Sequence, residues 1–139
     1  MDDDDLGERL RASIGALVRA SRAHADAMPE AQSQTLGFLL REGSLTVAEL
    51  AQRRKVRHQS MQTAVVELER AGLVERTPDP RDRRARLVGL TDEGHRTLRD
   101  ELGRRRSLLA TAIATELDAD EQALLARVPD LLQRLAARL

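Results

Sequence analysis

The stretch at residues 73–94, LVERTPDPRDRRARLVGLTDEG, constrains the fold more than any other part of this chain. Two short apolar runs, Leu73-Val74 and 87–90, flank a segment made of Pro, Asp and Arg. Apolar runs on either side of a turn-forming segment predict a β-hairpin, here with a charged loop at its tip. A helix that closes at Gly72 leads directly into this hairpin. The expected local structure is therefore a helix followed by a positively charged hairpin, which we call the wing.

The composition favours packed helices around the wing. The chain has 139 residues, which predicts one domain, and Phe38 is its only aromatic residue. The core must then consist of Leu, Val, Ala and Ile. The absence of cysteine excludes disulfides, thiolate–zinc sites and a thiol redox sensor. No apolar run reaches the length of a signal peptide or a membrane span, so we expect a soluble, cytoplasmic protein with no membrane partner.

Hydrophobic periodicity divides the remainder of the chain into helices. The expected helices cover residues 6–27, 30–41, 47–54, 58–71, 92–117 and 120–138, with a short extended link at 44–46. Thr46, with Glu49 three residues later, has the spacing of a capping box. The helix after it carries an apolar stripe of Met61, Ala64, Val65, Leu68 and Ala71. Thr91 is expected to cap the long helix that follows the wing.

Charge is unevenly distributed along a chain whose formal net charge is zero. Residues 53–86 hold ten lysines and arginines against five acids, a local charge of +5. The rest of the chain must then carry an equal negative charge. This polarity is typical of a protein in which one lobe meets phosphates.

Two helices joined by a tight turn and followed by a wing predict a winged helix-turn-helix. The second helix of such a pair enters the major groove of DNA and reads it with its N-terminal and outward side chains. Gln can bridge adenine, Arg can bridge guanine, and Ser or Thr can bond a base or a phosphate. The expected contacts of this helix are Arg57, His58, Gln59, Ser60, Gln62 and Thr63.

The wing is the second expected DNA contact, because arginine is favoured in a narrow minor groove. Asp82 lies two residues before Arg84 and could hold its guanidinium by a bidentate pair. The other wing arginines are better placed to contact phosphates. Sequence spacing alone leaves open which of the four arginines points into the groove. The expected wing contacts are Arg81, Asp82, Arg83, Arg84 and Arg86.

The terminal helices carry more leucine than one small lobe needs, which predicts a partner subunit. The alternative is a hairpin of the two C-terminal helices within one chain. The expected dimerisation residues are Leu10, Leu124, Val128, Leu131 and Leu135. The whole chain is then a mainly α fold with a small β-hairpin wing (α+β), a single domain over 1–139. Within it we expect a DNA-binding lobe at about 30–91, between dimerisation helices at about 6–27 and 92–138.

Residues 68–94, LERAGLVERTPDPRDRRARLVGLTDEG, resemble the signature of the MarR family of bacterial transcriptional regulators. Residues 46–72, TVAELAQRRKVRHQSMQTAVVELERAG, are similar to that family's helix-turn-helix. The resemblance implies a homodimer that binds a pseudo-palindromic operator in double-stranded DNA. It also implies that Arg84 probes the minor groove and that Asp82 pairs with Arg84. It also implies a repressor that a small-molecule effector, commonly an anionic phenolic compound, can release.

Other functions have little support in the sequence. His24, His58 and His95 lie on separate expected segments without metal-ligand spacing, so we expect no metal and no cofactor. No nucleophile motif or phosphate loop indicates an enzyme. His24 could line an effector pocket with Met28 and Phe38, or simply pack. The alternative function is a degenerate winged helix that acts as a protein-interaction module and binds DNA weakly. Its support is the zero net charge of the chain and Glu67, which stands where the MarR family often has a basic residue.

Overall fold

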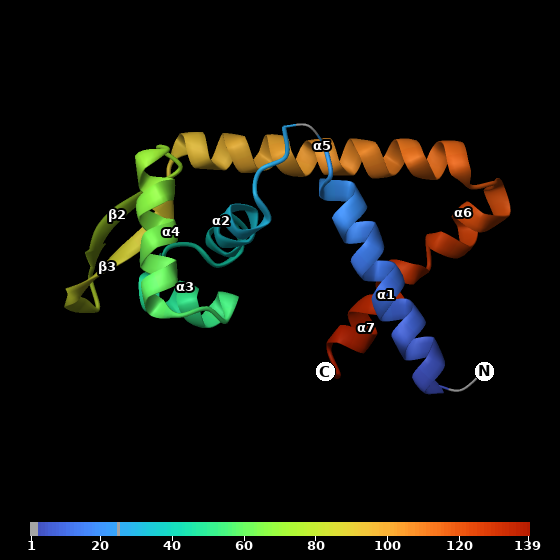
Figure 1. The fold of residues 1–139 in the computed structure, drawn as a ribbon, viewed down its shortest axis with the longest axis horizontal. Helices are drawn as coiled ribbons and strands as arrows, with labels where there is room; N and C mark the ends of the chain where they lie inside the picture. Colours follow the sequence, from blue (N-terminus) through green and yellow to red (C-terminus); the bar gives the residue numbers. More distant parts are fainter. Residues whose placement is uncertain (1–2, 25) are drawn as a thin grey trace. The chain divides into compact units, whose positions relative to one another are not determined.

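The computed structural model describes residues 3–24 and 26–139, and helices account for most of them. The elements are α1 (Asp3–Arg22), α2 (Glu30–Glu42), β1 (Leu45–Thr46), α3 (Val47–Arg54), α4 (His58–Arg70), β2 (Val74–Asp79), β3 (Asp82–Leu90), α5 (Asp92–Glu116), α6 (Ala119–Leu125) and α7 (Val128–Ala136) (Figure 1). The chain divides into two compact units, one ending at Gly103 and the other running from Arg104 to Leu139. The predicted class, mainly helical with a small hairpin wing, is confirmed.

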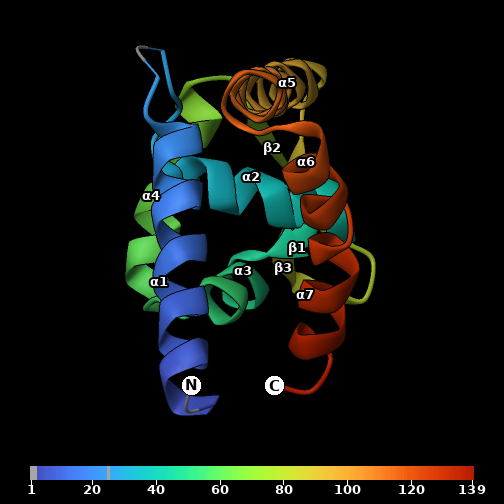
Figure 2. The same cartoon turned by 90° about the vertical axis from the view of Figure 1, so that its right-hand side faces the viewer.

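Local capping fixes the start of the helix-turn-helix. Thr46 Oγ1 accepts from the Glu49 backbone N–H, and Glu49 Oε1 accepts from the Thr46 backbone N–H, both at 3.1 Å. This confirms the predicted capping box, and α3 has the predicted bounds. Lys55 then takes a left-handed backbone conformation (φ 55°), which ends α3 and turns the chain toward α4. Both views show α3 lying below α2 (Figure 1 and Figure 2).

The wing is longer and more regular than the sequence predicts. β3 is the centre of a three-stranded antiparallel sheet in the order β1-β3-β2. Val74 pairs with Leu90 and, at the far end, Asp79 pairs with Asp82, after a shift of register at Pro78. The polar segment expected to be a loop is therefore mostly strand, and Arg83, Arg84 and Arg86 lie on β3. The expectation of a loop was wrong because the backbone hydrogen bonds between β2 and β3 continue to the exposed end of the hairpin. They do so even though the side chains on both faces of this end are polar.

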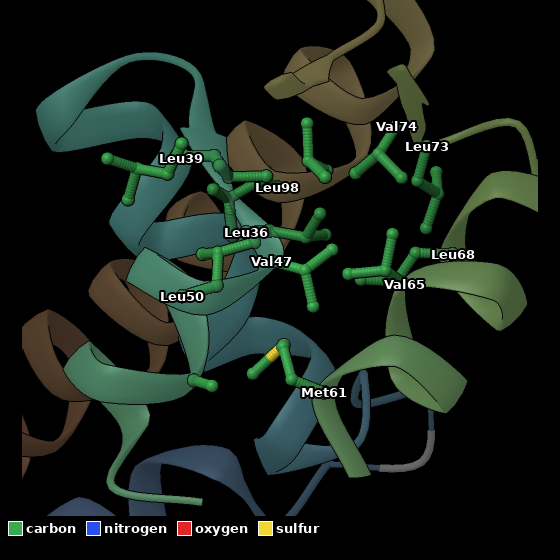
Figure 3. Packing of buried hydrophobic residues seen from close by; sticks show 13 residues of the cluster. Leu36, Leu39, Val47, Leu50, Met61, Val65, Leu68, Leu73, Val74 and Leu98 are labelled. Atoms are coloured by element: carbon green, nitrogen blue, oxygen red, sulfur yellow. The ribbon is translucent and has the colours of Figure 1, made fainter. Parts of the chain in front are cut away.

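The core lies between α2, α3, α4 and the sheet. Thirteen buried apolar residues form one cluster, and its fully buried members include Leu36, Leu50, Met61 and Val65 (Figure 3). Met61, Val65 and Leu68 come from the predicted stripe of α4 and are all buried. Ala71 is exposed instead, because the helix ends at Arg70 and Ala71 is its C-cap. Because α4 buries this apolar face, its polar face is exposed to solvent.

The largest differences from the predicted helix boundaries lie at the end of α1 and over residues 120–138. The first helix ends at Arg22 instead of near Met28, because Arg22 pairs with Glu30 and His24 turns in to meet Glu101. The single helix expected over 120–138 is two helices, α6 and α7. Pro129 lies in the first turn of α7, where its missing N–H is tolerated; inside a continuous helix its ring would clash with the carbonyl four residues before.

Thr46→Ala is expected to lower the free energy of unfolding by about 1 kcal/mol, because the first turn of α3 loses its side-chain cap. Denaturant unfolding at a fixed protein concentration measures the change. Thr46→Ser is the matched control, since serine keeps the hydroxyl that accepts from Glu49. A Thr46→Ala protein that unfolds at the wild-type midpoint, while Thr46→Ser does too, would show that the cap contributes nothing to stability.

Candidate nucleic-acid interface

The exposed face of α4 carries the predicted reading residues. Arg57 is the N-cap of α4, and His58, Gln59 and Ser60 form its first turn. All four are exposed, as is Thr63, while Gln62 is half-buried. The Thr63 hydroxyl donates to the Gln59 carbonyl at 3.2 Å, so it is used within the helix. The predicted set thus lies at the N-terminal half of α4, the part of a recognition helix that meets base edges.

Three wing arginines are free to reach a partner. Arg83, Arg84 and Arg86 are exposed. Among the described residues, none of their guanidinium groups has an ion pair or hydrogen bond. Because alternate residues of a strand point to the same face, Arg84 and Arg86 share one face of β3 and Arg83 takes the other. The wing therefore presents cations on both faces.

Asp82 does not hold the Arg84 side chain as the sequence suggested. Its Oδ1 accepts from the Arg84 backbone N–H at 2.9 Å. Within the described part of the chain no contact joins the Asp82 carboxylate to the Arg84 guanidinium. The reason is local geometry, since a carboxylate at the start of a strand reaches the amide two residues on more easily than a long side chain can fold back. Asp82 thus bonds the backbone of the turn, and the Arg84 side chain is exposed.

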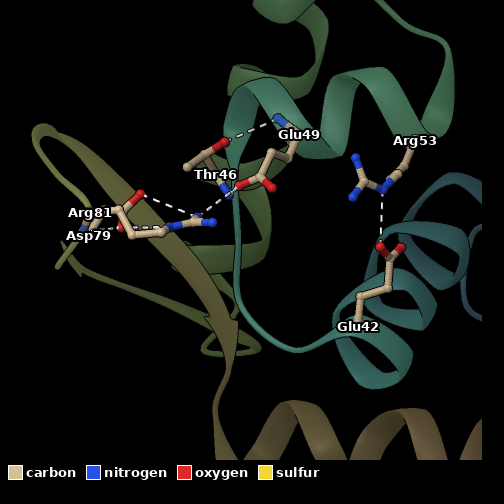
Figure 4. Close-up of polar contacts among 6 residues, drawn as sticks. All are labelled: Glu42, Thr46, Glu49, Arg53, Asp79 and Arg81. Carbon is tan, nitrogen blue, oxygen red and sulfur yellow. Dashed lines mark hydrogen bonds and ion pairs between the residues drawn. The ribbon is translucent and has the colours of Figure 1, made fainter.

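Arg81 is held by two carboxylates, unlike its neighbours. Its Nε lies 3.3 Å from Asp79 Oδ1, and its Nη2 lies 3.4 Å from Glu49 Oε1 (Figure 4). Its backbone N–H also donates to Asp79 Oδ1 at 2.9 Å, and this bond, followed by the guanidinium, lowers the pKa of Asp79 below its ordinary value. The Thr46 backbone N–H is the main cause that lowers the pKa of Glu49. Asp79 and Glu49 were absent from the predicted site.

A surface recess joins the two halves of the interface. It lies between the start of α3, the start of α4 and the wing. Its lining includes His58 from α4 together with Arg84 and Arg86 from β3. The structure therefore brings the first turn of α4 and one face of the wing to the same place, as a protein that follows DNA from one groove into the next requires.

His24, Met28 and Phe38, which the sequence offered as an effector pocket, have structural contacts. His24 Nε2 lies 3.2 Å from Oε2 of Glu101, a carboxylate that is buried on α5. Met28 and Phe38, which the sequence grouped with His24, pack against the core cluster. Over residues 3–24 and 26–139, no group of three or more metal-ligating side chains is close enough to hold an ion. None of the helices in that part of the chain is both long and apolar enough to cross a bilayer.

In the part of the chain that the structure describes, Glu67 has no ion pair with the nearby Arg70 that would neutralise its charge. It is exposed, and no ion pair joins it to Arg70 among the described residues. The acid that is paired on this helix is Glu69, whose Oε2 lies 3.5 Å from Arg76 Nε on β2. Glu67 lies about 14 Å along the helix axis from His58 at the rise of an α-helix, so it is remote from the first turn.

Comparison with known proteins identifies the family and the fold of the chain. A MarR-family model matches residues 28–85. An uncharacterised HTH-type transcriptional regulator of Mycobacterium bovis is 32% identical over 135 residues, 96% of this chain and 94% of that protein. The HTH-type transcriptional repressor MdtR of Bacillus subtilis is 35% identical over 80 residues, 58% of this chain and 52% of MdtR.

The structural comparison agrees. The crystal structure of a transcriptional regulator protein from Pseudomonas aeruginosa has a TM-score of 0.86 and 35% identity, and the match covers 97% of this chain and 95% of that one. Regulators of this kind bind DNA and are not enzymes, which confirms the predicted class of function. The winged helix-turn-helix, the polar start of α4 and the cationic wing all agree with this match, and the chain belongs to the MarR family of DNA-binding transcriptional regulators.

Proposed function

We propose that this chain is a homodimeric repressor that binds a pseudo-palindromic operator, with α4 in the major groove and the wing in the minor groove. One observation carries the proposal: His58 in the first turn of α4 lines the same recess as Arg84 and Arg86 of β3. The proposed base contacts are Arg57, His58, Gln59, Ser60, Gln62 and Thr63. Arg84 is the proposed minor-groove probe, with Arg83 and Arg86 on phosphates.

Exposed apolar side chains support the homodimer. Neither α1, α6 nor α7 has a buried residue, although each carries leucines. On α6 and α7, Leu124, Leu131 and Leu135 expose 65%, 48% and 53% of their surface. A cluster of large apolar side chains left in water is typical of a protein–protein interface. MarR-family regulators act as dimers, and each copy would then supply one α4 and one wing to one half-site.

Repression and release are the finer parts of the proposal. MdtR, which is 35% identical to this chain over 80 residues, is named a repressor. A dimer that covers its operator blocks access to it without any further activity. Effector ligands are known in the family, and we propose that a small molecule lowers the operator affinity of this chain as well.

The salt dependence of duplex binding tests the DNA interface directly. We expect the logarithm of the association constant for a random-sequence duplex to fall linearly with the logarithm of salt concentration. The slope should be about −0.9 for each phosphate contacted, because each contact releases condensed counterions. Fluorescence anisotropy between low and physiological salt measures it.

A second function has two observations in its favour. Glu67 is an exposed, unpaired acid on α4 within the described residues, and the formal net charge of the chain is zero. A protein-interaction module that binds DNA weakly would show no salt-dependent binding in the same titration. Glu67→Gln separates the two functions further, since removing a repelling charge should tighten duplex binding only if α4 lies against DNA.

A further inference from the structure

Arg81 joins two elements that are far apart in the sequence. It lies at the tip of the wing, yet its guanidinium contacts Asp79 at the end of β2 and Glu49 in the first turn of α3 (Figure 4). The Nη2 atom serves both acids, at 3.4 Å from Glu49 Oε1 and 3.5 Å from Asp79 Oδ2. This side chain is a bridge from the wing tip to the helix-turn-helix.

Backbone hydrogen bonds hold both carboxylates in place independently of the Arg81 guanidinium. Glu49 Oε1 already accepts from the Thr46 backbone N–H, which fixes the carboxylate in the capping box. The Asp79 residue is 5% exposed, and its Oδ1 already accepts from the Arg81 backbone N–H. A carboxylate with a fixed position loses little conformational freedom when it takes an additional partner, so the bridge has a defined geometry.

We propose that Arg81 is a positioning residue that sets the wing tip relative to α3, and that it is not one of the phosphate contacts. This inference rests on the proposed function, and it explains how the proposed DNA interface of α4 and the wing keeps its shape. α3 packs directly against α4, and β3 continues from the bridge to Arg84. The bridge therefore fixes the spacing between the first turn of α4 and the minor-groove probe, which must match the spacing of two adjacent grooves.

The charge of the cluster supports this role over phosphate binding. Arg81 contributes +1 and its two partners −1 each, so the cluster carries a net charge of −1. The lowered pKa values of Asp79 and Glu49 keep both carboxyls ionised at neutral pH. A net-negative cluster repels a phosphate. Arg83, Arg84 and Arg86, by contrast, have no acidic partner in the described chain and remain the cations of the wing.

Glu49→Gln gives opposite results under the two roles of Arg81. Glutamine is accepted at this position of a capping box, so the start of α3 is preserved while the ion pair is lost. If Arg81 positions the wing, duplex affinity should fall about twofold to fivefold, the range that corresponds to a partly exposed ion pair. If Arg81 is a phosphate contact that the acids restrain, removing an acid should tighten binding.

The salt slope provides an independent readout. Arg81→Ala should weaken duplex binding with an unchanged slope, because a positioning residue releases no counterions. Arg83→Ala is the matched control from the same wing, and its slope should be smaller in magnitude by about 0.9 per protomer. The double variant Glu49→Gln/Arg81→Ala should bind like Arg81→Ala alone, since both changes break the same bridge.

Amide hydrogen exchange over residues 79–86 tests the bridge without DNA. Arg81→Ala and Glu49→Gln should both speed exchange there, because the wing tip opens more often, while Arg83→Ala should not. Tighter binding by Glu49→Gln, or a reduced slope for Arg81→Ala, would overturn the inference while leaving DNA binding intact. Wild-type protein without any salt-dependent duplex binding would instead overturn the proposed function.

Discussion

Leu135→Asp should convert the proposed dimer into a monomer. Leu135 lies on the apolar side of α7 with Val128 and Leu131, at the spacing of one helix face. Leu131 and Leu135 expose about half of their surface within the single chain, so neither is part of its own core. In the proposed dimer, position 135 is covered by the partner. A carboxylate there would be removed from water without a counterion, at a cost of several kcal/mol. Sedimentation velocity at micromolar protein measures the change.

A charge placed elsewhere on α7 is the control for this experiment. Gln133 is exposed and lies off the apolar side of the same helix. Gln133→Asp adds the same charge in the same turn, so any effect on helix stability is matched, and it should sediment as a dimer. If Leu135→Asp also sediments as a dimer, α7 packs within its own chain and the predicted interface is wrong. Leu131→Asp should behave like Leu135→Asp.

Arg84→Ala is expected to weaken operator binding by about 1–3 kcal/mol, which is about fivefold to 150-fold. The Arg84 side chain is exposed on β3 and contacts no acid in the described residues, so its removal disturbs nothing in the folded protein. A guanidinium in a narrow minor groove meets an enhanced negative potential, and alanine loses that attraction. The measurement is the dissociation constant for a duplex that the wild-type protein has selected from a random pool.

Two comparisons make this test specific. Arg84→Lys keeps the charge but loses the planar fork, so it should recover part of the affinity and less of the sequence preference. The loss for Arg84→Ala should also shrink when the selected minor-groove sequence is replaced by G·C pairs, which widen the groove. Equal losses on both duplexes would make Arg84 a phosphate contact, and no loss on either would remove it from the interface. Circular dichroism should be unchanged for both variants.

Local signals in the sequence were sufficient for much of the architecture. The capping box of Thr46 and Glu49 fixed the start of α3, and the stop at Lys55 ended it where predicted. The stripe of Met61, Val65 and Leu68 predicted which face of α4 is buried. These features are readable because they depend on residues three or four positions apart, whose geometry the helix itself sets. The break before Pro129 was missed, although the proline was an equally local signal for it.

Other features depend on residues that meet only in the folded chain. The contact of His24 with Glu101 spans 77 positions, and it accounts for the early end of α1. The contact of Arg81 with Glu49 spans 32 positions, so counting charges along the wing could not separate Arg81 from Arg83, Arg84 and Arg86. Only the fold showed that Arg81, one of these four arginines, is ion-paired with two carboxylates of the same chain.

The amino-acid sequence by itself determined the order of the helices, the polar face of α4 and the presence of a cationic wing, because periodicity, caps and turn residues act over a few positions. The tertiary structure alone decided which wing cations are available and where the strands end. Ion pairs and sheet register join distant segments, and their partners are chosen by the path of the backbone, which no short window of sequence contains.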